Sequence, residues 1–202
     1  QSIDEARISQ GFTDTETSDI RRTRLKFFSN QLLMNQVGGE HRFDRLKDFS
    51  INWLYTNATA NRDEPNTRDY RFDSNRLTGN YFFSQRADSN QVMYADLTDK
   101  DQSWRVDGKL PWQLSGNHKI TLNSGFITQT KTRDSNIQRF NYFRFGPDAS
   151  RESIIGQSSL ESILQPQYIG TNGFQLRDVT RPSDKYNASQ NLLSYYGKVD
   201  WL

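Results

Sequence analysis

Hydrophobic and polar residues alternate with a period of two in several stretches of this chain, most clearly over Gln102–Leu114. Successive side chains of a β-strand point to opposite faces, so the alternation predicts a strand. One face would carry Trp104, Val106, Gly108, Leu110, Trp112 and Leu114, and the other Ser103, Arg105, Asp107 and Lys109. A run of about twelve residues exceeds the usual soluble strand and suits the roughly 9–11 residues that cross a bilayer.

The same alternation recurs along the chain, interrupted by short turns or by long polar connections. We predict an antiparallel sheet of four or five long strands near residues 24–43, 48–62, 102–114, 117–133 and 185–202, with almost no helix. The short turns are Asp44–Lys47 and Ser115–Asn117, and the long connections are 63–101 and 133–184. Short turns at one end of a sheet and long loops at the other are typical of outer-membrane barrels.

Three smaller features complete this prediction. Arg139–Phe145 is typical of a strand that projects beyond the bilayer, and Ser158–Glu161 resembles the capping box of a short helix. The polar start, Gln1–Ile20, resembles the end of another loop, and the last residues stop within a predicted strand. Both ends look truncated, so we expect residues 1–202 to be one part of a larger barrel domain.

Composition excludes some classes of protein and leaves two others open. The 202 residues include 26 Lys and Arg against 24 Asp and Glu, a net charge of +2, which argues against a nucleic-acid-binding protein. No apolar run approaches the roughly 18 residues of a membrane helix, which excludes a helical membrane protein. Hydrophobic residues make up only 33% of the chain. A soluble β-sandwich and a transmembrane β-barrel both remain open, because both can alternate.

The residues that usually carry catalysis or bind metals form no motif in this chain. Cysteine is absent, and His41 and His118 lie far apart with no second histidine beside either. The carboxylates show no paired spacing, and no serine has the G-x-S-x-G context of a nucleophile. We therefore expect no enzyme, no metal site and no cofactor.

Several short motifs, in order from about residue 38 to the end, resemble the barrel of TonB-dependent outer-membrane receptors. They are Gly39–Phe43 (GEHRF), Trp53, Arg62–Arg68 (RDEPNTR), Asp107–Pro111, Gly116–Ile120 with Gly125, Arg139-Phe140 with Arg144-Phe145, and Asp184–Ala188 with Tyr196. The resemblance implies a receptor of the bacterial outer membrane that takes up a scarce nutrient such as a metal chelate, cobalamin or oligosaccharide. It also implies a 22-stranded barrel, a plug and contact with the TonB complex; no plug or TonB-contact motif is recognisable in this sequence.

Together these observations predict an all-β chain: an incomplete wall of an antiparallel transmembrane β-barrel with long extracellular loops. The lipid-facing residues would be Phe49, Ile51, Trp53, Trp104, Val106, Leu110, Trp112, Ile120, Leu122 and Phe126. The lumen would be lined by Ser50, Asn52, Arg105, Asp107, Lys109, Thr121 and Asn123. The alternative is a soluble β-sandwich that binds carbohydrate or has a structural role.

Candidate ligand contacts lie in the second long connection. Arg139, Tyr142 and Arg144 combine positive charge with aromatic surface, which suits an unidentified anionic small molecule. They belong to a group of loop-flanking arginines that also includes Arg62, Arg68, Arg71 and Arg133. These arginines could instead pair with neighbouring Asp residues or with lipopolysaccharide phosphates, and the sequence leaves these alternatives open.

Overall fold

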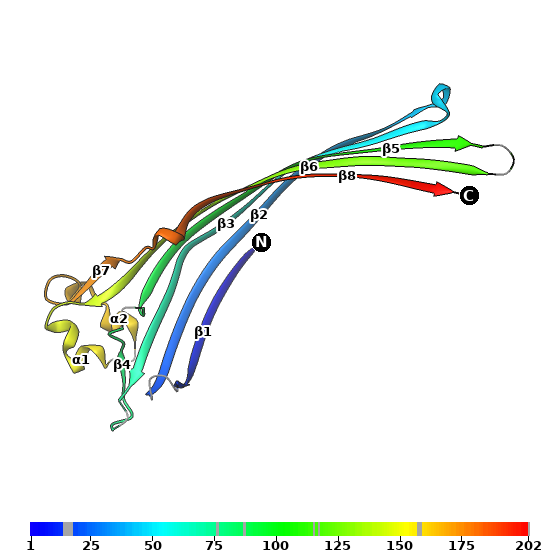
Figure 1. The fold of residues 1–202 in the computed structure, drawn as a ribbon. Helices are drawn as coiled ribbons and strands as arrows, with labels where there is room; N and C mark the ends of the chain where they lie inside the picture. The colour runs from blue at the N-terminus through cyan, green and yellow to red at the C-terminus, as the bar shows by residue number, and fades with distance from the viewer. Residues whose placement is uncertain are drawn as a thin grey trace. The chain divides into compact units, whose positions relative to one another are not determined.

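The computed structural model describes residues 1–13, 18–75, 77–86, 88–114, 116, 118–156 and 159–201. The chain is all-β and is built on one eight-stranded antiparallel sheet (Figure 1). Its strands are β1 (Ser2–Thr13), β2 (Ser18–Phe43), β3 (Phe49–Ser74), β4 (Tyr81–Phe83), β5 (Gln91–Gln113), β6 (Lys119–Arg144), β7 (Phe174–Asp178) and β8 (Lys185–Trp201).

The strand order is β1-β2-β3-β5-β6-β7, with β4 beside β3 and β8 beside β6. Antiparallel pairing, predicted from the alternation and the short turns, is confirmed. In the described part of the chain β1 pairs only with β2 and β8 only with β6, so the sheet is not closed into a barrel.

The predicted strands exist, but four of them are longer than the alternation indicates. β2, β3 and β6 each contain 26 residues, and β5 contains 23. β3 continues to Ser74 and β5 begins at Gln91, so the prediction of a loop over residues 63–101 is wrong at both ends. Polar residues on both faces hide the period of two there, whereas the backbone pairing continues because it does not depend on side-chain polarity.

The first strand was not predicted. Residues 1–20 were expected to be a loop, but Ser2–Thr13 forms β1 and pairs with β2 in continuous register from Ser2↔Ser29 to Thr13↔Ser18. Its alternation is weak because charged and polar residues fall on both faces. Cross-strand hydrogen bonds to β2 supply the pairing that the pattern does not reveal.

The short turn after β2 forms as expected, whereas Ser115 and Asn117 of the other predicted turn lie outside the described residues. Asp44–Leu46 forms the 3-10 helix η1, and Lys47 follows in the left-handed conformation with φ 59°. Such a residue reverses the chain direction within a few positions.

The described part of the connection between β6 and β8 contains five short helices and the short strand β7. β6 ends at Arg144, which confirms the predicted strand extension up to that residue. The helices are η2 (Asp148–Ser150), α1 (Glu152–Ile155), α2 (Leu160–Ile163) and η3 (Pro166–Tyr168), and η4 (Pro182–Asp184) precedes β8. α2 confirms the short helix predicted there; Ser158 lies outside the described residues, and Ser159 occupies the N-cap. None of the described helices has the length and hydropathy needed to cross a membrane.

The chain divides into two compact units, and each of the long strands β2, β3, β5 and β6 contributes residues to both. Unit 1 comprises residues 1–30, 62–96 and 135–186, and unit 2 comprises residues 31–61, 97–134 and 187–202. In unit 1, Phe83 of β4 packs edge-on against Phe72 and Phe174, with ring centroids 5.7 and 5.6 Å apart. Ile154, Ile155 and Ile163 from the short helices complete this buried core.

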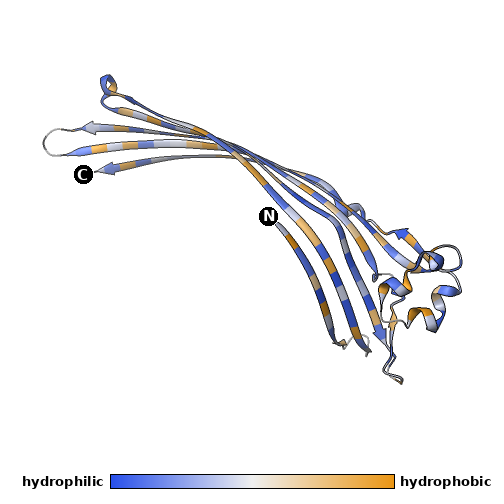
Figure 2. Ribbon diagram, turned by 180° about the vertical axis from the view of Figure 1, so that it is seen from behind, coloured by the Kyte–Doolittle hydropathy of each residue, from blue (hydrophilic) through white to orange (hydrophobic). Residues whose placement is uncertain are grey.

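Unit 2 contains a single layer. Its described elements are segments of β2, β3, β5, β6 and β8, which belong to one sheet, together with η1. All the fully buried hydrophobic residues of the described chain lie in unit 1. Figure 2 shows the hydrophobic and hydrophilic residues alternating along the strands. The hydrophobic side chains of unit 2 are therefore left without a protein core.

Candidate functional site

One face of the unit 2 sheet gathers aromatic side chains from neighbouring strands. Trp53 and Tyr55 of β3 both contact Trp104 of β5, with ring centroids 6.3 and 4.7 Å apart. A Cβ atom added to Gly108 would lie 3.5 Å from the ring of Phe49. The odd-numbered residues of β3 and the even-numbered residues of β5 therefore share this face.

The apolar residues of β6 lie on the same face. The backbone N–H of Leu114 donates to the carbonyl of His118 at 3.0 Å, which sets the register of the β5–β6 hairpin. Directly opposed residues of antiparallel strands point the same way, so Leu122 and Phe126 join Leu110 and Val106. We call this surface of unit 2 the apolar face: Phe49, Ile51, Trp53, Trp104, Val106, Leu110, Trp112, Ile120, Leu122 and Phe126.

The opposite face of unit 2 is joined by polar contacts. Asp107 accepts a hydrogen bond from Arg105 at 2.7 Å and one from the Tyr196 hydroxyl at 2.9 Å. Asp200 accepts one from the Asn123 side-chain amide at 2.9 Å. Leu54 and Leu192 also lie here, so this face is mostly but not wholly polar. The two faces are thus chemically distinct, as the alternation predicts.

The apolar face is open to its surroundings. Trp104, Trp112, Leu122 and Phe126 are 42–46% exposed, and the other members are half-buried by their neighbours within the sheet. Contiguous apolar surface of this kind marks contact with a membrane or with another protein.

The three candidate ligand contacts lie in unit 1, and each has a structural partner. Arg139 pairs with Asp184 at 2.9 Å, Arg144 donates to the Ala149 carbonyl at 2.7 Å, and Tyr142 packs against the buried core. Burial lowers the pKa of the Arg144 guanidinium. These contacts hold the loop against β6.

The remaining loop-flanking arginines also pair within the chain. Arg62, Arg71 and Arg133 bond the carboxylates of Glu64, Asp73 and Asp99, respectively, and Arg68 donates to the Asn66 side chain. Each of these four arginines therefore has a polar partner within the chain.

Glu64 is the most enclosed of these carboxylates. It accepts from Lys26 at 3.1 Å and from Arg62 at 2.6 Å, and its side chain is only 8% exposed. Burial raises its pKa, but the hydrogen bonds from the two cations outweigh burial and hold the pKa below its usual value. The ion pair is a structural element of unit 1 that the sequence did not reveal.

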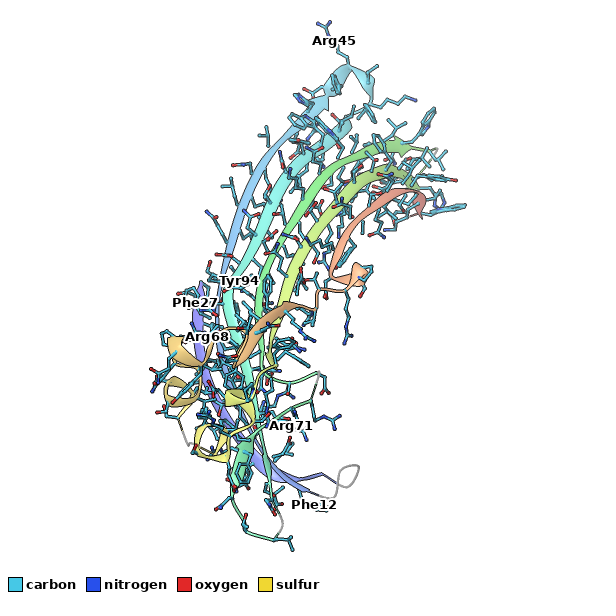
Figure 3. The ribbon with its side chains drawn as sticks, turned by 90° about the vertical axis from the view of Figure 1, so that its left-hand side faces the viewer. Phe12, Phe27, Arg45, Arg68, Arg71 and Tyr94 are labelled. Carbon is cyan, nitrogen blue, oxygen red and sulfur yellow. The ribbon has the colours of Figure 1, made fainter. Side chains whose placement is uncertain are left out.

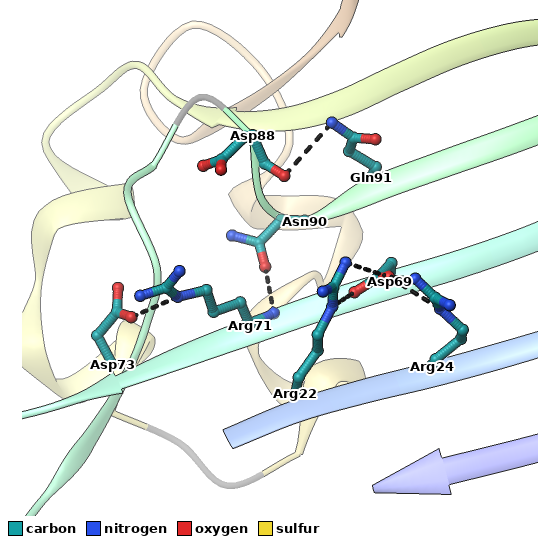
Figure 4. A network of polar contacts seen from close by, with 8 residues as sticks. All are labelled: Arg22, Arg24, Asp69, Arg71, Asp73, Asp88, Asn90 and Gln91. Atoms are coloured by element: carbon teal, nitrogen blue, oxygen red, sulfur yellow. Dashed lines mark hydrogen bonds and ion pairs between the residues drawn. The ribbon is translucent and has the colours of Figure 1, made fainter. Parts of the chain in front are cut away.

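A second feature missed from sequence is a group of arginines on β1 and β2. Arg22 and Arg24 both donate to Asp69 of β3, and the Nη2 atom of each lies 2.7 Å from Asp69 Oδ2 (Figure 4). Arg7 of β1 is the direct register partner of Arg24. The spacing of Arg22 and Arg24, two residues apart, places them on one face of a strand, but recognising the group required knowing that residues 2–13 form β1.

Within the described residues, no group of three or more His, Cys, Asp or Glu side chains is arranged to hold a metal ion. No family model matches the chain, and no curated protein matches it.

Proposed function

We propose that this chain forms part of the wall of a transmembrane β-barrel in a bacterial outer membrane, with the apolar face of unit 2 turned toward lipid. The observation that carries the proposal is a single-layer sheet with an exposed aromatic and aliphatic face and a hydrogen-bonded polar face. A barrel wall needs this division, because one face meets hydrocarbon and the other meets a polar lumen.

The alternative, a soluble sandwich, needs a second sheet about 10 Å from the first to bury the apolar face. All the strands of unit 2 in the described structure belong to one sheet. Burying one large apolar side chain away from water contributes about 1.5–3 kcal/mol of favourable free energy. The exposed side chains of the apolar face would therefore gain much free energy from an apolar partner. Lipid is the partner that accounts for a face of this composition without a second sheet.

The long strands fit the same proposal. A strand of 26 residues extends about 85 Å at roughly 3.3 Å per residue. Only about 9–11 residues are needed to cross the hydrocarbon layer, so the remainder can stand in water and carry loops. The connection after β6, with its own buried core, is a loop of this kind.

The finer proposal is that the barrel belongs to a TonB-dependent receptor, which takes up a scarce nutrient with energy delivered through the TonB complex. It is supported by the order of the motifs from Gly39–Phe43 to Asp184–Ala188. Contacts with TonB and with a plug would be made by parts outside this chain. Arg139 and Arg144 would then position the ligand-binding loop through their contacts with Asp184 and Ala149.

The proposal can be tested on the full chain reconstituted in phospholipid vesicles. The sequence contains no cysteine, so a single Leu110→Cys or Lys109→Cys change gives a unique site for a nitroxide label. These neighbours lie on opposite faces of β5. The label at 110 should collide readily with oxygen dissolved in lipid, and the label at 109 with a water-soluble nickel chelate. Equal accessibility at both positions, or a label at 110 shielded from both reagents, contradicts the proposal.

A further inference from the structure

Three arginines meet on one face of the β1–β2 hairpin in unit 1. In the antiparallel register Arg7 lies opposite Arg24, Ser9 opposite Arg22, and Gly11 opposite Ile20. Directly opposed residues project from the same face of a sheet. We call this surface the basic groove; it has a volume of about 400 Å³, and its lining includes Arg7, Ser9, Gly11, Ile20, Arg22 and Arg24.

The charges in the basic groove are incompletely balanced. Asp69 is the one carboxylate that Arg22 and Arg24 share, and its Oδ2 accepts from both. Among the described residues, Arg7 has no ion-pair partner. The nearest further carboxylate on β1 is Glu5, whose register partner is Lys26, itself paired with Glu64. Asp69 is hydrogen-bonded to two of the three guanidinium groups, and Asp88 acts on Arg22 only through space, so the groove keeps an excess of positive charge.

Asp69 offsets part of the repulsion among these arginines, and a bound anion would offset more of it. Like charges directly opposite each other on adjacent strands destabilise a sheet, and Arg7 and Arg24 are such a pair. An anion between them would convert the repulsion into attraction. Arg22 and Arg24 remain about half exposed despite their bonds to Asp69, so their other N–H groups can reach a ligand.

We propose that the basic groove binds a divalent oxyanion, the simplest example being a phosphate monoester group. Its negative charge is attracted by the excess of positive charge from the three arginines. Guanidinium groups donate paired N–H bonds that fit the spacing of phosphate oxygens, and the Ser9 hydroxyl is a further donor. Gly11 leaves the floor open, because a Cβ atom there would meet nothing within 4 Å.

This inference goes beyond the proposed barrel function and does not depend on it. It rests only on the hairpin of β1 and β2 and on Asp69. A negative result in the nitroxide experiment would not bear on anion binding by the basic groove. A negative result in the binding experiment below would not bear on the barrel proposal.

The test is titration of the full chain in detergent with inorganic phosphate, followed by calorimetry. Arg7→Gln should weaken phosphate binding about tenfold, the change expected from the loss of one charge-assisted hydrogen bond. The matched control is Arg45→Gln, because Arg45 is an exposed arginine on η1, outside the groove (Figure 3). It should bind phosphate like the unmodified chain. Asp69→Asn, which adds one net positive charge, should strengthen binding several-fold.

A second arm separates two sources of the phosphate group. Phosphatidylcholine vesicles that contain phosphatidic acid, whose head group is a phosphate monoester, are compared with free phosphate, using the same variants. Binding to either that is weakened by Arg7→Gln and not by Arg45→Gln supports the proposal, and the preferred probe identifies lipid or solute. Absence of binding to both, or equal weakening by both substitutions, overturns it. Arg24→Lys keeps the charge but loses the paired donors, so it should bind phosphate more weakly than the unmodified chain; unchanged affinity would contradict the paired-donor geometry.

Discussion

Replacement of Phe83 by alanine should release the loop structure of unit 1 from the sheet. Phe83 is 1% exposed and contacts three aromatic rings, those of Tyr70, Phe72 and Phe174. Its strand, β4, is held to β3 by only three register pairs. The described α-helices of the loop have four residues each, far too short to be stable without packing.

The expected cost follows from this burial. Removing a buried phenylalanine side chain costs about 3–5 kcal/mol, from lost transfer free energy and from the cavity left behind. Local unfolding of the loop should take up this cost, because the strands retain their backbone pairing. Hydrogen exchange of the amides in residues 145–184 should therefore accelerate by at least about a hundredfold, since each 1.4 kcal/mol corresponds to a factor of ten.

The matched control is Leu77→Ala in the same connection, where the side chain is 96% exposed. Its effect on stability should lie within about 0.5 kcal/mol. If Phe83→Ala leaves exchange in 145–184 unchanged, or if both variants accelerate it equally, the core does not hold the loop and the reasoning is refuted.

Three further outcomes are expected. Leu110→Arg on the apolar face should lower the stability of the lipid-reconstituted chain by about 2–4 kcal/mol in urea titration, and Ser103→Arg on the other face of β5 should cost far less; equal losses would contradict a lipid-facing surface. Gly125→Ala should destabilise unit 2 by about 1–3 kcal/mol, because the new Cβ would lie 2.5 Å from Asp107 Oδ1 and 2.8 Å from the Val106 carbonyl oxygen. An unchanged temperature of thermal unfolding would count against this packing. Burial raises the pKa of Asp184, but hydrogen bonds from the Arg181 backbone and from Arg139 outweigh burial, so the pKa lies below its usual value. The stability that Asp184 gives the loop is therefore complete at neutral pH and is lost as pH falls from about 5. Asp184→Asn should flatten this acid dependence of hydrogen-exchange protection in the loop, and an unchanged pH profile would exclude this role of Asp184.

The sequence determined those parts of the fold that depend on local pattern. Alternation over Gln102–Leu114 identified β5 and its two faces, and the contacts of Trp104 and Asp107 separate those faces in the structure. The turn at 44–47 was equally local, since a few residues with turn-compatible backbone angles reverse the chain. Side-chain direction in a strand has a fixed period, so such assignments need no knowledge of distant residues.

Only the tertiary structure decided the features made by residues far apart in the chain. The pairing of Phe83 with Phe174, and of Arg139 with Asp184, joins segments whose separation no local pattern encodes. The strand β1 was hidden because interstrand hydrogen bonds, and not apolar alternation, hold it against β2. The basic groove depends in turn on that pairing, since Arg7 meets Arg24 only when the hairpin register brings two like charges opposite each other, a cost that local sequence does not display.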